Sequence, residues 1–438
     1  MRQAFRKRQL SFESLEGREL LAGNINAGLD VNGNLVLTGD VNNNHVIVTR
    51  AFFSNQIIVQ GGQSGSGDSN SSTLINGVNA SRSFNTTGGV IVNMGDGNDR
   101  VMLTDIGVQG NVTGNLGRGN DQFALQSSSS GASSFTLNDG STPTFSKASV
   151  SGLVNISAGD GNDLFAFDDA TVGGDFTFGG GNGFDRFVST GTDPDNNAVF
   201  GSVVLNPGGA NDSISINRMA VGANFTINDG AATSSSNVNI VNIRVNLDIL
   251  MNLSIFADNV VLTGEDNGAN RFQARNVQIN TGNGVDRVQV DRGIMVDLIV
   301  STGIGAEQIN GAAGVNVTNL NVNNRVYVDT GDGNDIAFLN LINTDTLRVY
   351  AQSGADRITA NNISATDALY NTLGGQDFLG LHDSTYFFLS AFLGDDNDTL
   401  QIRSLKVTNS ALFDGGSGVN TYQNQGGNTF NSLQRRNI

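Results

Sequence analysis

The chain has 438 residues, with 24 Lys and Arg against 41 Asp and Glu, for a formal net charge of −17. It has no Cys and only two His, which excludes disulfides, cysteine nucleophiles and His-rich metal sites. The acidic balance is unfavourable for nucleic-acid binding, whereas a hydrophobic content of 38% suffices for a core.

Residues 1–24 are predicted to be an export or sorting leader. Basic residues in this segment precede a short Ser/Glu/Leu stretch that lacks the roughly 7–15 apolar residues of a secretory signal. Residues 15–22 (LEGRELLA) resemble the LE-x-R-x-LL motif that opens many repetitive surface proteins of planctomycete bacteria, although that family usually has Pro where this chain has Gly17. The resemblance implies export to the outside or the surface of a bacterial cell.

Residues 25–88 are predicted to form a β-rich N-terminal cap. Short apolar runs at 35–37, 45–48 and 56–59 are separated by Gly and Asn turns, which favours hairpins. The open end of a stack of strands is an aggregation hazard and needs such a cover.

A repeat occupies residues 89–425. Gly-rich turns that end in an acid, such as the GDGND turn at 95–99, recur with a period of roughly 22 residues, shortening to roughly 21 residues in the last coils. Longer gaps between turn acids, from 185 to 212 and from 307 to 335, predict loop insertions. The gap from 121 to 163 is close to two periods and predicts two coils. Residues 236–262 keep the apolar alternation without the Gly turn and are predicted to be plain coils, and residues 426–438 a C-terminal tail.

Apolar residues alternate on both sides of each turn, as Val154 and Ile156 do before Asp163 and Phe165 and Phe167 do after it. This alternation predicts strands with one buried face, and Phe123, Phe165 and Phe187 are expected to form one inward ladder. A return to the same register once per period predicts an all-β parallel solenoid. The spacing favours a right-handed β-helix over a β-roll, which would need two such turns in roughly 18 residues.

Stacked coils would place the turn acids in one column, and unit charges about 4.8 Å apart repel by roughly 3.5 kcal/mol at an effective dielectric near 20. Ca²⁺, which takes carboxylate and carbonyl oxygens, would relieve that repulsion. Residues 180–188 (GGNGFDRFV) match the nonapeptide of the RTX family, and the resemblance implies calcium at the turns. The predicted calcium ligands are Asp96, Asp99, Asp121, Asp160, Asp163, Asp185, Asp332, Asp335 and Asp398.

Two alternatives need no metal. Asp and Asn are ordinary turn residues, because their side chains bond the local backbone. Arginine also follows the acid at positions 100, 186, 287 and 357, from where it could neutralise the column.

The predicted function is that of an exported structural or adhesive surface protein, with no catalytic residue. The alternative is a polysaccharide-binding or polysaccharide-cleaving protein that resembles pectate lyases, for which the candidate pairs are Asp168–Asp169, Asp395–Asp396 and His382–Asp383. Each pair also fits the turn pattern without catalysis. The expected partners are other copies of the chain, cell-surface components or polysaccharide, with no nucleic acid and no membrane span. All five Tyr lie in the last third, where a sugar-stacking platform would have to use them.

Overall fold

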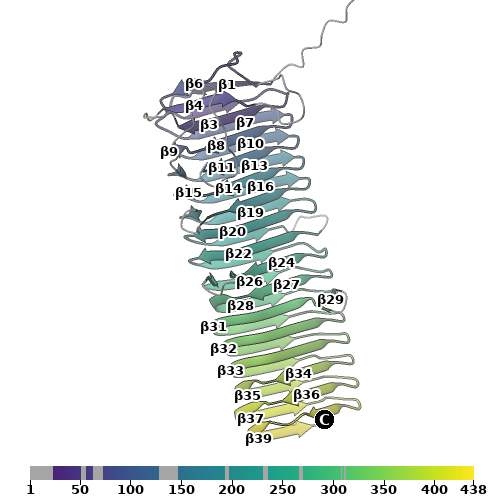
Figure 1. Ribbon diagram of the computed structural model, residues 1–438. Helices are drawn as coiled ribbons and strands as arrows, with labels where there is room; N and C mark the ends of the chain where they lie inside the picture. Colours follow the sequence, from purple (N-terminus) through teal and green to yellow (C-terminus); the bar gives the residue numbers. More distant parts are fainter. Residues whose placement is uncertain are drawn as a thin grey trace, which may run out of the picture.

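The computed structural model describes residues 23–50, 56–62, 73–127, 147–192, 197–229, 235–265, 270–306, 308–309 and 312–438. Strands account for 64% of the chain, and the described ranges contain no helix. The strands are stacked into a rod that runs from the N-terminal end, purple, to the C-terminal end, yellow (Figure 1). Residues 1–22, which hold most of the predicted leader, lie outside the described residues.

One sheet contains 37 of the strands, and most of its pairings are parallel, between a strand and its equivalent one coil later. This arrangement is consistent with the predicted β-solenoid. Each coil contributes to up to three ladders of parallel strands, named A, B and C here in the order in which the chain meets them after the turn acid.

Ladder A follows the turn acid, and its fifteen strands set the number of coils. They are β3 (His45–Arg50), β8 (Arg100–Thr104), β11 (Gln122–Gln126), β14 (Leu164–Asp168), β17 (Arg186–Thr190), β20 (Ser213–Val221), β22 (Asn237–Val245), β24 (Asn259–Thr263), β27 (Arg287–Asp291), β31 (Val315–Asp329), β32 (Ile336–Tyr350), β33 (Arg357–Asn371), β34 (Phe378–His382), β36 (Thr399–Arg403) and β38 (Thr421–Asn424).

Ladder B continues each coil after a corner, and ladder C leads into the next turn; long strands such as β31, β32 and β33 bend through all three. The further strands of ladder B are β9 (Gly107–Val108), β12 (Ala148–Val150), β15 (Ala170–Val172), β18 (Ala198–Val199), β25 (Phe272–Gln273), β28 (Gly293–Ser301), β35 (Thr385–Phe392), β37 (Lys406–Asp414) and β39 (Thr429–Arg436). Those of ladder C are β2 (Leu35–Thr38), β7 (Val90–Asp96), β10 (Val112–Arg118), β13 (Val154–Asp160), β16 (Phe176–Asn182), β19 (Val203–Gly208), β21 (Phe225–Asn228), β23 (Asp248–Asn252) and β26 (Asn276–Asn280).

The region of the predicted cap differs from the rest of the rod because several of its strands pair antiparallel. β1 (Asn24–Leu29) pairs antiparallel with β2, and β4 (Ile57–Gly61) pairs antiparallel with both β3 and β6 (Arg82–Phe84). β5 (Leu74–Ile75) adds to β1, while β2 and β3 pair in parallel with β7 and β8. The hairpins therefore join directly onto ladders A and C.

The core is a column of inward side chains from the three ladders. Phe123, Phe165 and Phe187 stack with ring centroids 5.4 and 5.5 Å apart, which confirms the predicted inward ladder. Near the C-terminal end, the hydroxyls of Tyr370 and Tyr386 lie 2.8 Å apart, and both side chains are fully buried. The two polar tips thus satisfy each other inside an apolar interior.

The register corrects one predicted coil count. Phe123 pairs directly with Phe165, so the stretch from Asp121 to Asp163 forms one coil and not two. The extra residues lie between Gln126 and Ala148, where the chain passes from ladder A to ladder B. Since this insertion is as long as one period, the interval between the two turn acids equals two periods and suggests two coils.

The two shorter insertions are confirmed. Val154 pairs with Phe176 one coil later, and Phe176 pairs with Val203 in the next coil. The coil from Phe176 to Val203 is therefore longer than the coil from Val154 to Phe176. In the later insertion, β29 (Gln308–Ile309) and β30 (Ala312–Ala313) form a separate hairpin outside the main sheet.

Strand pairing also continues into the predicted tail. β39 pairs in parallel with β37, and β38 pairs with β36. The final segment has few apolar residues, which is why its sequence reads as a tail. Its Phe430 nevertheless packs on the buried Phe413, with ring centroids 6.0 Å apart.

Candidate functional site

Glycines in the turns that close ladder C allow close stacking of one turn on the next. Gly331 and Gly333 have φ angles of +78° and +146°. A Cβ at either position would lie 1.4 or 1.3 Å from the carbonyl oxygen of Gly303 or Gly305 in the preceding coil. At these two positions the turn backbones therefore approach one another too closely for a side chain, whereas the equivalent positions of later turns hold Gln352, Leu373 and Asp396.

The acid that ends each turn points into the rod. The Oδ1 atom of Asp121 accepts the backbone N–H of Asp99 at 2.8 Å, and Asp163 accepts that of Asp121 at 2.7 Å. The same bond recurs along the chain, and the acids that make it are at most 3% exposed. We call these inward residues the aspartate column: Asn44, Asp99, Asp121, Asp163, Asp185, Asp212, Ser236, Asp258, Asp286, Asp335, Asp356, Asp377, Asp398 and Asn420.

In six turns the residue before the column member is an Asn that makes a second bond, of opposite direction: Asn43, Asn98, Asn120, Asn162, Asn334 and Asn397. Asn98 accepts the backbone N–H of Asn120 in the following coil at 2.8 Å, and Asn120 accepts that of Asn162 at 2.8 Å. The interfaces at these six turns are thus held from both sides, by an Asn that reaches forward and a column residue that reaches back. The Asn-Asp ending of the turn motif encodes this pair of side-chain bonds to backbone.

The second carboxylate oxygen of the column aspartates, Oδ2, differs from Oδ1 in its hydrogen bonding. In several members it is buried and has no hydrogen-bond partner: Asp99, Asp121, Asp163, Asp185, Asp212, Asp356 and Asp398.

The terminal member Asn420 shows which groups surround this atom. Its Nδ2 donates to the carbonyl oxygens of Gly415 at 2.7 Å and Ser417 at 3.3 Å, both in its own turn. At the other end, Nδ2 of Asn44 donates to the carbonyl of Asn42 at 2.7 Å. The position therefore suits a donor, which a neutral carboxyl supplies and a carboxylate does not.

Burial makes most of the column acids weak. It raises the pKa of Asp99, Asp163, Asp212, Asp258 and Asp398 to about 6. It raises the pKa to about 7 for a second set, in most of which neighbouring acids add to the effect: Asp121, Asp185, Asp286, Asp356 and Asp377. Removal of a carboxyl from water disfavours its charged form, and each backbone N–H only partly opposes this. Protonation is therefore a third way to relieve the repulsion of the column.

The arginines that follow the acids do not neutralise it. Arg100, Arg186, Arg287 and Arg357 are all exposed, because adjacent residues of a strand point to opposite sides. Arg357 instead lies over the ring of Phe378, with the guanidinium carbon 4.0 Å from the ring centroid.

The predicted calcium ligands fall into two groups. Asp99, Asp121, Asp163, Asp185, Asp335 and Asp398 belong to the column, whereas Asp96 and Asp160 are exposed and Asp332 is half-buried on the outside of the turn.

Each predicted inner and outer pair is therefore split between the two sides of its turn. The outer Asp160 accepts a hydrogen bond from Asn182 at 2.8 Å, and Asp332 accepts one from Ser353 at 2.6 Å. The turn carbonyls are also used: that of Asp160 accepts the N–H of Gly119 at 2.7 Å. Within the described ranges, no three His, Cys, Asp or Glu side chains converge. This donor set fits a shell of six to eight oxygens poorly, and calcium binding stays a prediction.

Three members of the column do not follow the Gly-rich turn motif and are not predicted from the sequence. Asn44 starts it, and Ser236 and Asp258 continue it through the segment predicted to consist of plain coils. Ser236 has no carboxyl, and its hydroxyl bonds to Asp229, which lies earlier in the same turn region. The signal available in the sequence is the position of Ser236 and Asp258 two residues before the next inward apolar residue.

The candidate catalytic pairs are engaged in local hydrogen bonds. Asp169 accepts the N–H and hydroxyl of Thr192 at 2.8 and 2.9 Å, and its neighbour Asp168 is 5% exposed. In the exposed pair, Asp395 accepts the hydroxyl of Ser417 at 2.8 Å.

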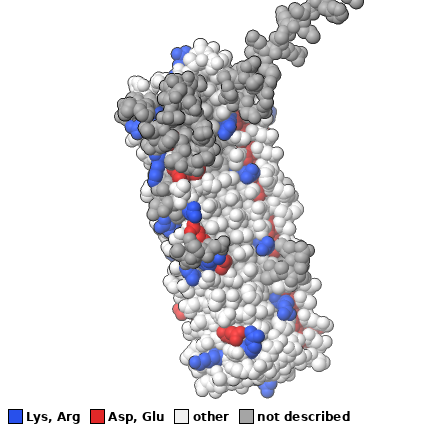
Figure 2. Space-filling view, in the orientation of Figure 1, with Lys and Arg blue, Asp and Glu red and all other residues white. Residues whose placement is uncertain are grey.

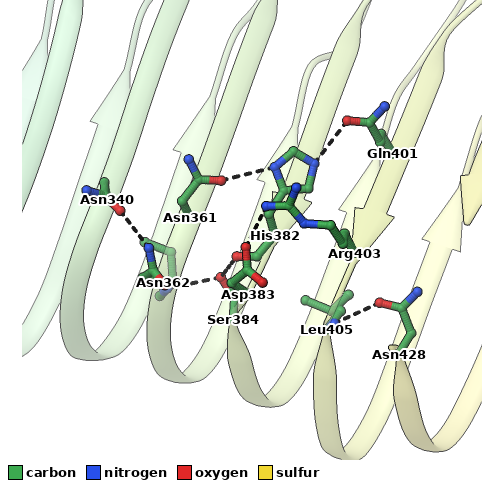
Figure 3. A network of polar contacts seen from close by, with 11 residues as sticks. Asn340, Asn361, Asn362, His382, Asp383, Ser384, Gln401, Arg403, Leu405 and Asn428 are labelled. Atoms are coloured by element: carbon green, nitrogen blue, oxygen red, sulfur yellow. Dashed lines mark hydrogen bonds and ion pairs between the residues drawn. The ribbon is translucent and has the colours of Figure 1, made fainter. Parts of the chain in front are cut away.

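His382 and Asp383 point to different partners (Figure 3). The Nδ1 and Nε2 atoms of His382 lie 3.0 Å from the side-chain oxygens of Asn361 and Gln401, in the coils on either side. Asp383 instead pairs with Arg403 at 2.6 Å. Burial lowers the pKa of His382. The network links three coils on the outer face of ladder A, and it contains no His–Asp contact of the kind that activates a general base.

No protein-family model, curated protein or solved structure matches this chain. Within the described ranges, no helix is long and apolar enough to cross a membrane.

Proposed function

We propose that this chain is an exported structural or adhesive protein of a bacterial surface, wound as a right-handed β-helix. The observation that carries the proposal is the aspartate column, whose side-chain bonds to the backbone link successive coils over most of the described length and are joined in six turns by opposed Asn bonds. Fifteen coils at about 4.8 Å make a rod of roughly 70 Å. Such a body supports a role in spanning distance and presenting surface.

The surface of the rod agrees with this role. Much of the face that is not grey in Figure 2 is uncharged, and its charged side chains form small separate groups that contain both signs. The candidate acid pairs within the described ranges are held by structural hydrogen bonds. Both features favour a scaffold over a polysaccharide lyase or hydrolase, which stays the alternative function.

Antibody labelling of intact cells tests the surface assignment. We expect an antibody raised against the purified chain to label intact source cells, and external protease to remove the label. Permeabilised cells supply the control for internal protein. Labelling confined to permeabilised cells would overturn the assignment.

A thermal melt tests the calcium prediction. Because the column oxygens bond to backbone N–H groups and lie apart from the outer acids, we expect the melting temperature at pH 7 to change by less than about 2 °C between EGTA and 5 mM calcium. Magnesium at the same concentration controls for ionic strength. A large rise specific to calcium would show that the turns form a metal array after all, because a ligand bound only by the folded state stabilises it.

A further inference from the structure

The outer side of ladder C changes character along the rod. In the N-terminal coils its last outward position holds small polar residues, and Asn228 donates to Asn206 at 3.3 Å and accepts from Asn252 at 3.3 Å. From β31 onward the same position holds, coil by coil, an alternation of polar and aromatic residues: Asp329, Tyr350, Asn371, Phe392 and Asp414. None of the five is buried, so the alternation does not serve the core.

Tyr327 enlarges this surface from the neighbouring outward position. Its ring centroid lies 5.4 Å from that of Tyr350, with the planes inclined at 38°. The Tyr327 hydroxyl donates to Asp329 at 3.2 Å, and Gln352 donates to the same carboxylate at 3.3 Å. The backbone N–H of Gly331 also donates to this carboxylate, at 3.1 Å, so three of its about four acceptor positions are used and one is left for a ligand hydroxyl.

The charges on this surface are largely compensated. Arg348 lies between Tyr327 and Leu369 in the ladder and pairs with Asp367, while Arg325 lies 3.9 Å from Asp297. A strongly charged polymer would find no excess of opposite charge here. Aromatic rings beside hydrogen-bonding groups suit a ligand with apolar faces and hydroxyl edges.

We infer that the outer face of ladder C between Tyr327 and Asp414 binds a neutral, linear polysaccharide laid along the rod. The rings of Tyr350 and Phe392 occupy alternate coils, roughly 9.6 Å apart, a distance on the order of a disaccharide unit. Each ring stacks on a sugar face, and Asp329, Asn371 and Asp414 accept or donate hydrogen bonds to hydroxyls. The inference rests on the proposed adhesive function and specifies its partner.

Affinity electrophoresis of the full chain in gels that contain one polysaccharide tests this site. The neutral probes are soluble β-glucan and xyloglucan, and the charged comparators are polygalacturonate and alginate. We expect a neutral probe to retard the chain, Tyr350→Ala to weaken binding at least tenfold, and Tyr350→Phe to restore most of it. Phe200→Ala is the matched control and should bind normally, because Phe200 is 67% exposed and directly follows β18 of ladder B.

Three results would overturn the site: no retardation by either neutral probe, stronger retardation by the charged comparators, or equal loss in the Phe200 control. Circular dichroism of each variant verifies the fold. Incubation of the same polysaccharides with the chain should leave their length unchanged, and shortening would instead support the enzymatic alternative. Failure of binding leaves the surface labelling unaffected, so the two proposals fail separately.

Discussion

Raising the pH from 5 to 8 is expected to destabilise the folded rod by roughly 10 kcal/mol in total, because the aspartate column must ionise inside the protein. Each column acid with a pKa raised to about 6 or 7 favours folding while it is neutral. That contribution is fully present below the unfolded pKa near 3.8, and it is lost as the pH rises through 6 to 7. A shift of about three units corresponds to about 4 kcal/mol for one group, and coupled neighbours do not add in full.

The groups that face the column cannot offset this loss. The neighbours that raise the pKa of Asp356 are Asp335, Asp377 and Asp332, all acidic. The basic side chains that follow the acids point outward. Surface acids behave in the opposite way: hydrogen bonds from Arg275 and Arg403 lower the pKa of Asp248 and Asp383, and their contribution disappears below about pH 4. Stability should therefore be greatest near pH 4 and fall as the pH rises from there.

Denaturant unfolding followed by circular dichroism at pH 5, 6, 7 and 8 measures this dependence. High salt serves as the control, because it screens surface charges but hardly affects buried ones. A midpoint that stays constant or rises from pH 5 to 8 would contradict the neutral column. It would show that the carboxylates are ionised and compensated.

The strand pattern could be predicted from the sequence because side-chain direction alternates with period two. Val101 and Leu103 lie two and four residues after Asp99, and all three are buried. The same parity places the turn acids of the described ranges inside, on the side opposite to the outer acids. The calcium prediction, which came with the resemblance to RTX turns, groups Asp96 with Asp99. These residues are three positions apart, and an odd separation places them on opposite sides of the turn.

Other features depend on information that no periodicity contains. An insertion as long as one coil, between Gln126 and Ala148, is invisible to interval counting. The bonds of His382 to Asn361 and Gln401 arise from side chains 21 and 19 residues away, whose meeting requires the register between coils. The two directions of the Asn and Asp bonds likewise follow from backbone geometry and not from composition.

Replacement of one column acid should show whether the column carboxyls are protonated, ionised with a bound calcium ion, or ionised without one. Asp356→Asn keeps an Oδ1 acceptor for the N–H of Asp335, now 2.9 Å away, and adds the donor that Asn420 already places in its own turn. We expect this variant to match the wild type near pH 4 and to exceed it by about 2–4 kcal/mol at pH 8. Asp356→Ala leaves the buried N–H without an acceptor and should lose about 2–3 kcal/mol at pH 5.

The exposed Asp395 supplies the matched control, since Asp395→Asn removes the same charge from the outside of a turn and should change stability by less than about 0.5 kcal/mol. If Asp356→Asn were as damaging as Asp356→Ala at pH 8, the anion itself would be required. Repetition in 5 mM calcium would then assign the counter-charge: a loss seen only with calcium present identifies a bound cation. If Asp356→Asn is more stable than the wild type at pH 8 with and without calcium, the column carboxyls are held in their protonated form. The amide reproduces the neutral carboxyl in shape and hydrogen bonding but cannot ionise.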